Sequence, residues 1–143
     1  MRSLKTTLRI CGWCLAFAVA EAGLYLSYRH HDARFHWFVH FFVGGSAALL
    51  VMSAVAWFRG RAVPYPLVWL LAGHVYAMVP DFLFLLFGIA HDRWMDVFLW
   101  HIRAHFIPGR NITWYLIFLA SLAVHLVILA RVGDKEPGKP GVQ

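Results

Sequence analysis

Two pairs of histidines in this chain have the spacing that lets one helical face hold a single ion. His36 and His40 are four residues apart, and His101 and His105 repeat that interval. Residues at i and i+4 lie on the same side of a helix, and imidazoles paired in this way are common ligands of zinc. Together with a carboxylate they also suit iron and manganese. The two pairs predict a divalent-metal site, with zinc preferred and iron or manganese as alternatives.

Asp81 is the acid that the sequence offers to these histidines. It follows Pro80 inside an apolar run, where a charged side chain at the centre of a bilayer costs about 2.5–3.5 kcal/mol on insertion scales. His74 precedes Asp81 by two helical turns, so both side chains point the same way. Polar residues at this depth need partners, which the histidine pairs could supply. The predicted metal ligands are His36, His40, His74, Asp81, His101 and His105.

A metal ion with an open coordination position could support hydrolysis at this site. Such an ion lowers the pKa of a bound water to about 7 and so makes hydroxide available near neutral pH. Asp92 and Asp96 lie in the polar segment that precedes the second histidine pair. A carboxylate beside the ion could act as general base or orient a ligand histidine. We therefore predict Asp92 and Asp96 as the catalytic acids.

The composition places these residues in a membrane protein. Of 143 residues, 61% are hydrophobic and only 14% are charged, whereas about 25% of an average soluble domain is charged. The net charge of +6 comes from basic residues at the ends of apolar runs, which is typical of membrane anchoring and not of a nucleic-acid surface. The expected class is an all-α polytopic membrane protein whose main partner is the lipid bilayer, with no nucleic-acid partner.

Four apolar runs predict transmembrane helices at about residues 10–28, 37–57, 66–89 and 112–131. Between the last two, apolar residues recur every three or four positions over residues 92–107, which predicts an amphipathic helix lying in the membrane interface. Gly44 and Gly45 in the second span predict close contact between helices. Residues 1–132 should form one four-helix domain, and the Gly/Pro/Lys-rich segment 133–143 a disordered tail.

An even number of spans places both chain ends on one side of the membrane. The terminal side would carry Arg2, Lys5, Arg9, Arg59, Arg61, Arg131, Lys135 and Lys139. The other side would carry Arg29, Arg34, Arg93, Arg103 and Arg110. Because Lys and Arg accumulate on the cytoplasmic side, we expect both termini in the cytoplasm. Most of the histidines and acids then share the outer half of the protein, and this asymmetry points to one site there.

Several polar residues also have a purely structural interpretation. Glu21 in the first span is expected to pair with Arg29 or with a histidine, and His125 to be packed and hydrogen-bonded within the fourth span. Interfacial histidines commonly contact lipid headgroups. This interpretation is preferred for His30, His31 and His91. The Cys11-Gly12-Trp13-Cys14 segment lies in an apolar helix, where packing is favoured over redox or metal chemistry.

Three segments resemble the family of small bacterial inner-membrane proteins known as membrane-bound metal-dependent hydrolases. His40 with Gly44 resembles the family's early His-x-x-x-Gly segment, and Pro80-Asp81 resembles its Pro-Asp motif. His101-Ile102-Arg103-Ala104-His105 resembles its later His/Arg/His cluster. The resemblance covers about residues 36–109. It implies that His40, Asp81, His101 and His105 bind metal, that the activity is hydrolytic, and that the protein resides in the bacterial inner membrane.

Three functions are compatible with these features. The first is a metal-dependent hydrolase that acts on a lipid-like ester at the extracytoplasmic face. The second is an accessory or structural subunit of a larger membrane complex, or a homo-oligomer, whose histidines contact lipid or a neighbouring chain. The third is a redox protein with histidine-ligated metal or haem. Elemental analysis and an absorption spectrum distinguish these alternatives.

Overall fold

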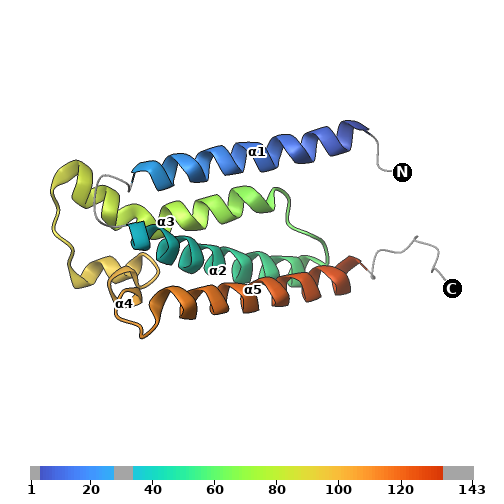
Figure 1. Ribbon diagram of the computed structural model, residues 1–143. Helices are drawn as coiled ribbons and strands as arrows, with labels where there is room; N and C mark the ends of the chain where they lie inside the picture. The colour runs from blue at the N-terminus through green and yellow to red at the C-terminus, as the bar shows by residue number, and fades with distance from the viewer. Residues whose placement is uncertain (1–3, 28–33, 134–143) are drawn as a thin grey trace.

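A computed structural model describes residues 4–27 and 34–133 of the chain (Figure 1). Four long helices dominate it: α1 (Leu4–Ser27), α2 (Arg34–Arg59), α3 (Pro66–Phe87) and α5 (Arg110–Gly133). Each is long and apolar enough to cross a membrane. The described part of the chain contains no strand, so the predicted all-α fold with four candidate spans is confirmed. The predicted tail lies, apart from Gly133, outside the described residues.

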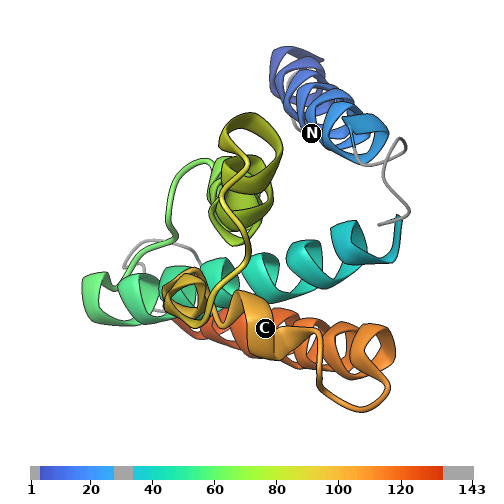
Figure 2. The same ribbon diagram turned by 90° about the vertical axis from the view of Figure 1, so that its left-hand side faces the viewer.

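Helix α2 is the centre of the bundle, with α3 packed on one side and α5 on the other. In α2, 56% of the apolar span is buried, against 6% in α1. Figure 2 shows α1 standing apart from the other three long helices. Bilayer lipid can satisfy the apolar surface that α1 leaves uncovered, because lipid tails are as apolar as the side chains of a helix.

Two glycines allow α2 and α3 to cross at very short range. A Cβ atom built on Gly44 would lie 2.2 Å from the backbone oxygen of Gly73, and one on Gly73 would lie 2.3 Å from the oxygen of Gly44. Gly45 faces the Phe118 ring of α5, which a Cβ would approach to 2.9 Å. The close contact predicted for Gly44 and Gly45 is therefore confirmed, with each glycine facing a different neighbour of α2.

The connection between α3 and α5 differs from the continuous amphipathic helix predicted over residues 92–107. It consists of a 3-10 helix, η2 (Arg93–Val97), and a single turn of helix, α4 (His101–Ala104). Leu99 and Trp100 between them both have φ of 57°, a left-handed conformation that a continuous helix of L-residues does not adopt. The Asp96 carboxylate accepts hydrogen bonds from the backbone nitrogens of Ile102 and Arg103, which begins a new helix in another direction.

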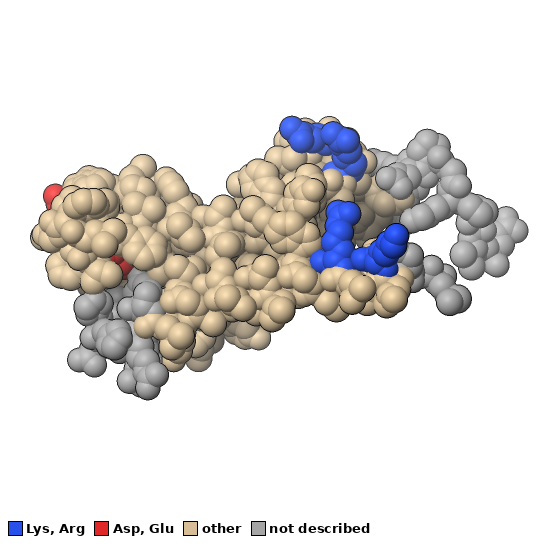
Figure 3. Space-filling view, turned by 90° about the horizontal axis from the view of Figure 1, so that it is seen from above, with Lys and Arg blue, Asp and Glu red and all other residues tan. Residues whose placement is uncertain are grey.

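The start of α1 and the end of α5 lie at one end of the bundle, called the terminal end here, and η2 and α4 lie at the other (Figure 1). Lys and Arg side chains gather near the terminal end in the view of Figure 3, whereas the acidic side chains visible there lie towards the opposite end. The described basic residues on the terminal side are Lys5, Arg9, Arg59, Arg61 and Arg131, all exposed. This arrangement separates a basic end from the end that gathers the histidines.

Candidate metal centre

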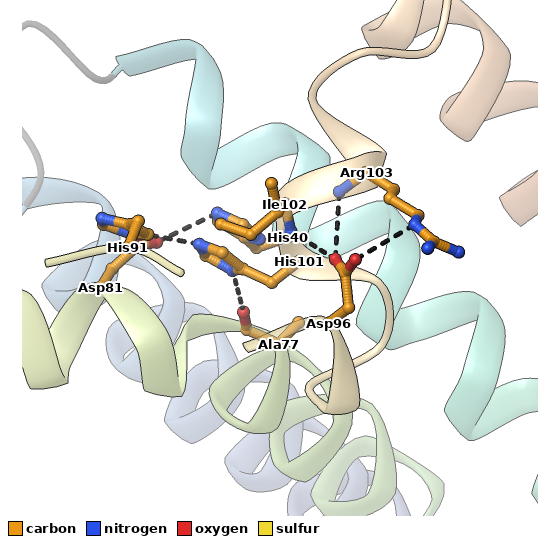
Figure 4. Close-up of polar contacts among 8 residues, drawn as sticks. All are labelled: His40, Ala77, Asp81, His91, Asp96, His101, Ile102 and Arg103. Atoms are coloured by element: carbon orange, nitrogen blue, oxygen red, sulfur yellow. Dashed lines mark hydrogen bonds and ion pairs between the residues drawn. The ribbon is translucent and has the colours of Figure 1, made fainter. Parts of the chain in front are cut away.

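Asp81 lies at the centre of a cluster of imidazoles at the end of the bundle away from the termini (Figure 4). Its Oδ2 is 3.0 Å from Nε2 of His40. Its Oδ1 is 3.0 Å from Nε2 of His91 and 3.3 Å from Nε2 of His101. Three ring nitrogens from three segments of the chain therefore converge on one carboxylate.

The glycine crossing brings the first of these residues together. His40 lies one turn before Gly44 on α2, and Asp81 lies about two turns after Gly73 on α3. Because the two backbones almost touch at the glycines, the side chains one and two turns away can meet across the helix interface. Ala77, midway between Gly73 and Asp81, has no side chain long enough to separate the helices, and its carbonyl oxygen serves the site directly.

Three hydrogen bonds hold α4 and the adjoining η2 against the long helices. Nδ1 of His101 donates to the carbonyl oxygen of Ala77 on α3 at 3.0 Å. Nε1 of Trp114 on α5 donates to the carbonyl oxygen of Ala104 at 3.2 Å. The hydroxyl of Tyr76 on α3 donates to the carbonyl oxygen of Val97 at 3.2 Å. Two of these ties bind α4 itself and the third binds η2 beside it, so α4 keeps its position although it is only one turn long.

Three imidazole rings form a stack, and a fourth ring meets the stack edge-on. His40 and His101 lie face to face with centroids 4.5 Å apart and 1° between their planes, and His91 stacks on His101 at 5.2 Å and 13°. His105 meets both His40 and His101 edge-on, at 5.1 and 5.4 Å. Parallel rings this close leave no space for a porphyrin between them, so the arrangement does not suit haem held between two of these histidines.

The hydrogen bond to Ala77 determines the protonation of the His101 ring. A carbonyl oxygen only accepts, so Nδ1 of His101 carries a proton. Nε2 of the same ring lies 3.3 Å from Oδ1 of Asp81. A second proton on Nε2 makes this contact an ion pair. In the neutral ring Nε2 presents a lone pair, which a cation beside the carboxylate could accept.

The ligand atoms lie close enough for one ion to join them. His40, His101 and His105 form one group, and Asp81, His91 and His101 form another, each with its candidate ligand atoms within 4.8 Å of one another. Ligands bonded at about 2.0–2.1 Å to one tetrahedral zinc lie about 3.3 Å apart, close to the 3.0–3.3 Å distances around Asp81. The backbone carbonyl that orients His101 is a typical partner of a metal-ligating histidine. These groups could hold a metal ion.

The structure brings together four of the six predicted metal ligands: His40, Asp81, His101 and His105. The side chain of His36 lies outside the described residues. His74 lies apart from both groups: its Nδ1 is 2.8 Å from Oε2 of Glu21 on α1. The prediction that Glu21 pairs with a histidine is thus confirmed, and the partner is His74. His125 is packed and bonded as predicted, with its Nδ1 3.0 Å from the Ser53 hydroxyl oxygen.

The two predicted catalytic acids are both engaged with nearby backbone. Asp92 is exposed, and its Oδ1 accepts a hydrogen bond from the backbone nitrogen of Arg93 at the start of η2. Asp96 accepts from the two backbone nitrogens that begin α4 and forms an ion pair with the Arg103 side chain at 3.2 Å. These contacts give Asp92 and Asp96 local structural roles, and their catalytic role stays a prediction.

His91 is the member of the cluster that sequence reasoning missed. It follows Asp81 by ten residues, an interval that no single helix would bring together on one face, and its position in the sequence favours lipid contact. Gly88 ends α3 with φ of 66° and turns the chain back, which places His91 over the carboxylate of Asp81. The available signal was the Gly88 stop so soon after Asp81, because a left-handed C-cap reverses the chain within a few residues.

Comparison with known proteins found no matching family model, no matching curated protein and no matching solved structure. The resemblance to membrane-bound metal-dependent hydrolases therefore rests on the three short segments in the sequence. All three segments contribute side chains to a single cluster, through His40, Asp81 and the pair His101 and His105.

Proposed function

We propose that this protein is a membrane-embedded metalloprotein that uses a divalent ion, with zinc preferred, to hydrolyse a lipid-like ester. The observation that carries the proposal is the convergence of Nε2 atoms of His40, His91 and His101 on the Asp81 carboxylate at 3.0–3.3 Å. A divalent cation among these atoms would be coordinated by imidazole nitrogens and a carboxylate oxygen. When bound, such an ion would polarise the ester and supply hydroxide near neutral pH.

The residues of the cluster divide into holding and proton-transfer roles. His40 and His101 are buried, with 1% of each side chain exposed, and their surroundings keep their rings fixed. Asp81 provides the negative charge that selects a cation. His91 has 34% of its side chain exposed, so it is the ring that can reach both Asp81 and solvent. We assign to His91 the transfer of protons between the site and the substrate's leaving group.

A hollow beside the cluster supports a substrate from the lipid phase. It has a volume of about 480 Å³ and is lined by His105, Ile107, Gly109, Asn111 and Ile112. The hollow combines an imidazole and an amide with apolar side chains, at the end of helices that could span a bilayer. A headgroup ester at the membrane surface can enter such a hollow while its acyl chains stay in the lipid.

Elemental analysis of the purified, detergent-solubilised protein tests the metal site. We expect about one divalent ion per chain in the native protein and less than a tenth of that in His101→Ala, because the variant loses a ligand shared by both groups. His125→Ala is the matched control, since His125 is also a buried histidine but bonds Ser53 between α2 and α5. Native protein without stoichiometric metal rejects the site and favours an accessory or structural role. Metal with no ester hydrolysis rejects the enzyme alone.

A further inference from the structure

Helix α1 contacts the α3 segment at two levels, first at Tyr65 just before α3 and then at His74 within it, and a groove runs along the two helices. Near the terminal end, the rings of Trp13 and Tyr65 lie 5.5 Å apart. Deeper in the bundle, Glu21 and His74 form their 2.8 Å contact. Only 6% of the α1 span is buried, so the surface between these two contacts is not covered by other helices of the described chain.

Two adjoining cavities lie along the two helices, the larger around the Trp13–Tyr65 contact and the smaller on its Glu21 side. The larger has a volume of about 350 Å³ and the smaller about 90 Å³. Trp13, Leu67 and Val68 line both, so the cavities run together along the two helices. The larger one begins at Arg9 and the smaller one ends at Phe17 and Leu71. Eight residues of helix rise by about 12 Å, which gives the length of this α1–α3 groove.

The groove has the polarity of one lipid molecule. Arg9 lines the groove at the terminal end of the molecule. The wall further from that end is made of apolar and aromatic side chains: Trp13, Ala16, Phe17, Leu67, Val68 and Leu71. Other exposed basic residues lie at the same end of the molecule, among them Lys5 on α1 and Arg61 between α2 and α3. The described acidic residues line neither cavity: Glu21 lies one turn beyond Phe17 on α1, and Asp81, Asp92 and Asp96 lie around the far end of the bundle.

We propose that the α1–α3 groove is a binding site for a membrane phospholipid with a net negative charge. The lipid phosphate lies against Arg9, whose guanidinium matches a phosphate in geometry and charge. One acyl chain follows the groove between Trp13 and Phe17 towards Glu21. A bound lipid would cover the face of α1 that protein leaves open, and would hold this helix against the bundle. The site is independent of the metal centre, which lies at the other end of the molecule.

Native mass spectrometry of the full-length, delipidated protein tests this site. Phosphatidylglycerol and phosphatidylcholine with the same acyl chains are added in turn, and the bound fraction is measured. We expect native protein to retain the anionic lipid preferentially, and Arg9→Gln to bind it about fivefold more weakly, as expected for one basic residue near an anionic headgroup. Arg131→Gln removes an exposed cation at the same end but outside the groove, and should leave binding unchanged.

A second variant tests the acyl-chain part of the groove. Ala16→Phe fills the smaller cavity with an apolar ring that a membrane helix tolerates, and should weaken binding of both lipids while thermal unfolding stays cooperative. Equal retention of the two lipids by native protein would overturn the proposal. So would an equal loss in Arg9→Gln and Arg131→Gln, or full lipid binding by Ala16→Phe.

Discussion

At the scale of single residues, the site depends on how one carboxylate and one backbone carbonyl constrain three imidazoles. Asp81 is approached by Nε2 atoms of His40, His91 and His101, and the hydrogen bond from Nδ1 of His101 to Ala77 turns Nε2 of that ring towards Asp81. In an apolar setting, each such group needs a partner of opposite character. A metal ion meets this requirement for the whole cluster at once, whereas protons would have to be placed on individual rings.

Asp81→Asn isolates the contribution of the negative charge. The amide has nearly the same shape but cannot neutralise a cation, so we expect less than a tenth of the native metal content. Metal that binds only the folded state stabilises it by about 2.7 kcal/mol when free metal exceeds the dissociation constant a hundredfold. A chelator should therefore lower the thermal unfolding midpoint of native protein and leave that of Asp81→Asn unchanged. Asp92→Asn, whose exposed side chain accepts from the backbone nitrogen of Arg93, should keep the native chelator response.

Glu21→Ala tests whether His74 belongs to the metal site. Glu21 and His74 are 7% and 0% exposed, and removal of Glu21 leaves the His74 ring without its carboxylate. We expect the free energy of unfolding to fall by about 1–3 kcal/mol, the usual cost of an unsatisfied buried polar group. The metal content by elemental analysis should equal that of native protein. Loss of metal in this variant would place His74 with the ligands after all.

The contrast between His74 and His91 shows what residue spacing can and cannot predict. Helical periodicity correctly puts His74 and Asp81 on one side of α3, but seven residues also separate them by about 10 Å along the axis. At that depth His74 meets Glu21 on α1 instead. His91 reaches Asp81 through a chain reversal at Gly88, and spacing within a helix carries no information about such a contact. The other predicted members of the cluster could be found from the sequence. His101 and His105 have the spacing of paired ligands, and Asp81 is the acid that follows Pro80.

At the scale of helices, the Gly44–Gly73 crossing sets the distance between His40 and Asp81. Gly44→Ala would place a methyl group against the Gly73 backbone oxygen, which the rigid backbones cannot avoid without moving apart. We expect a loss of about 1–3 kcal/mol in unfolding free energy from this overpacking, together with weaker metal binding. Gly12→Ala is the control, because nothing lies within 4 Å of its Cβ position. It should leave metal binding unchanged and slightly stabilise α1. Equal metal affinity in both variants would contradict this role of the crossing.

The Asp96→Ala variant tests whether Asp96 positions the metal ligands or acts in catalysis. Its carboxylate accepts hydrogen bonds from Ile102 and Arg103 at the start of α4, the turn that carries His101. If it positions the ligands, Asp96→Ala should weaken metal binding by about 10–100-fold, as is typical when a supporting partner of a ligand is lost. Turnover at saturating metal should then be close to native. If Asp96 is the general base, metal titration would be normal and kcat would fall.

The same residues explain why the sequence predicted one amphipathic helix where the structure has two short ones. Met95, Phe98, Leu99 and Ile102 do recur at helical intervals, and Met95 is fully buried. The break arises from the left-handed conformations of Leu99 and Trp100 and from the Asp96 cap. Neither has a local sequence signal, because non-glycine residues rarely adopt this conformation. Tertiary ties to Ala77 and Trp114 override the periodic pattern.

At the scale of the whole molecule, four long apolar runs were enough to predict the helices, because a span requires about 20 apolar residues and few other patterns satisfy that. The loose attachment of α1 could not be predicted in the same way. Lipid and protein present similar apolar surroundings to a membrane helix, so composition does not reveal which face packs against a neighbour. The excess of Lys and Arg at the terminal end of the bundle could be predicted from the sequence. This excess predicts which end of the protein faces the cytoplasm.

The basic end of the bundle predicts the side from which the metal centre can be reached. Lys and Arg concentrate on the cytoplasmic side of membrane proteins, and in this chain they gather at the terminal end, opposite the histidine cluster. We therefore expect the site at the extracytoplasmic face of a bacterial inner membrane, with both termini inside. Because a membrane-impermeant chelator reaches only one face, it should strip metal from the protein in intact spheroplasts and leave it in sealed inside-out vesicles. Both preparations should lose metal once detergent opens them, which controls for affinity. Protection in spheroplasts and loss in inside-out vesicles would reverse the topology while leaving the metal site intact.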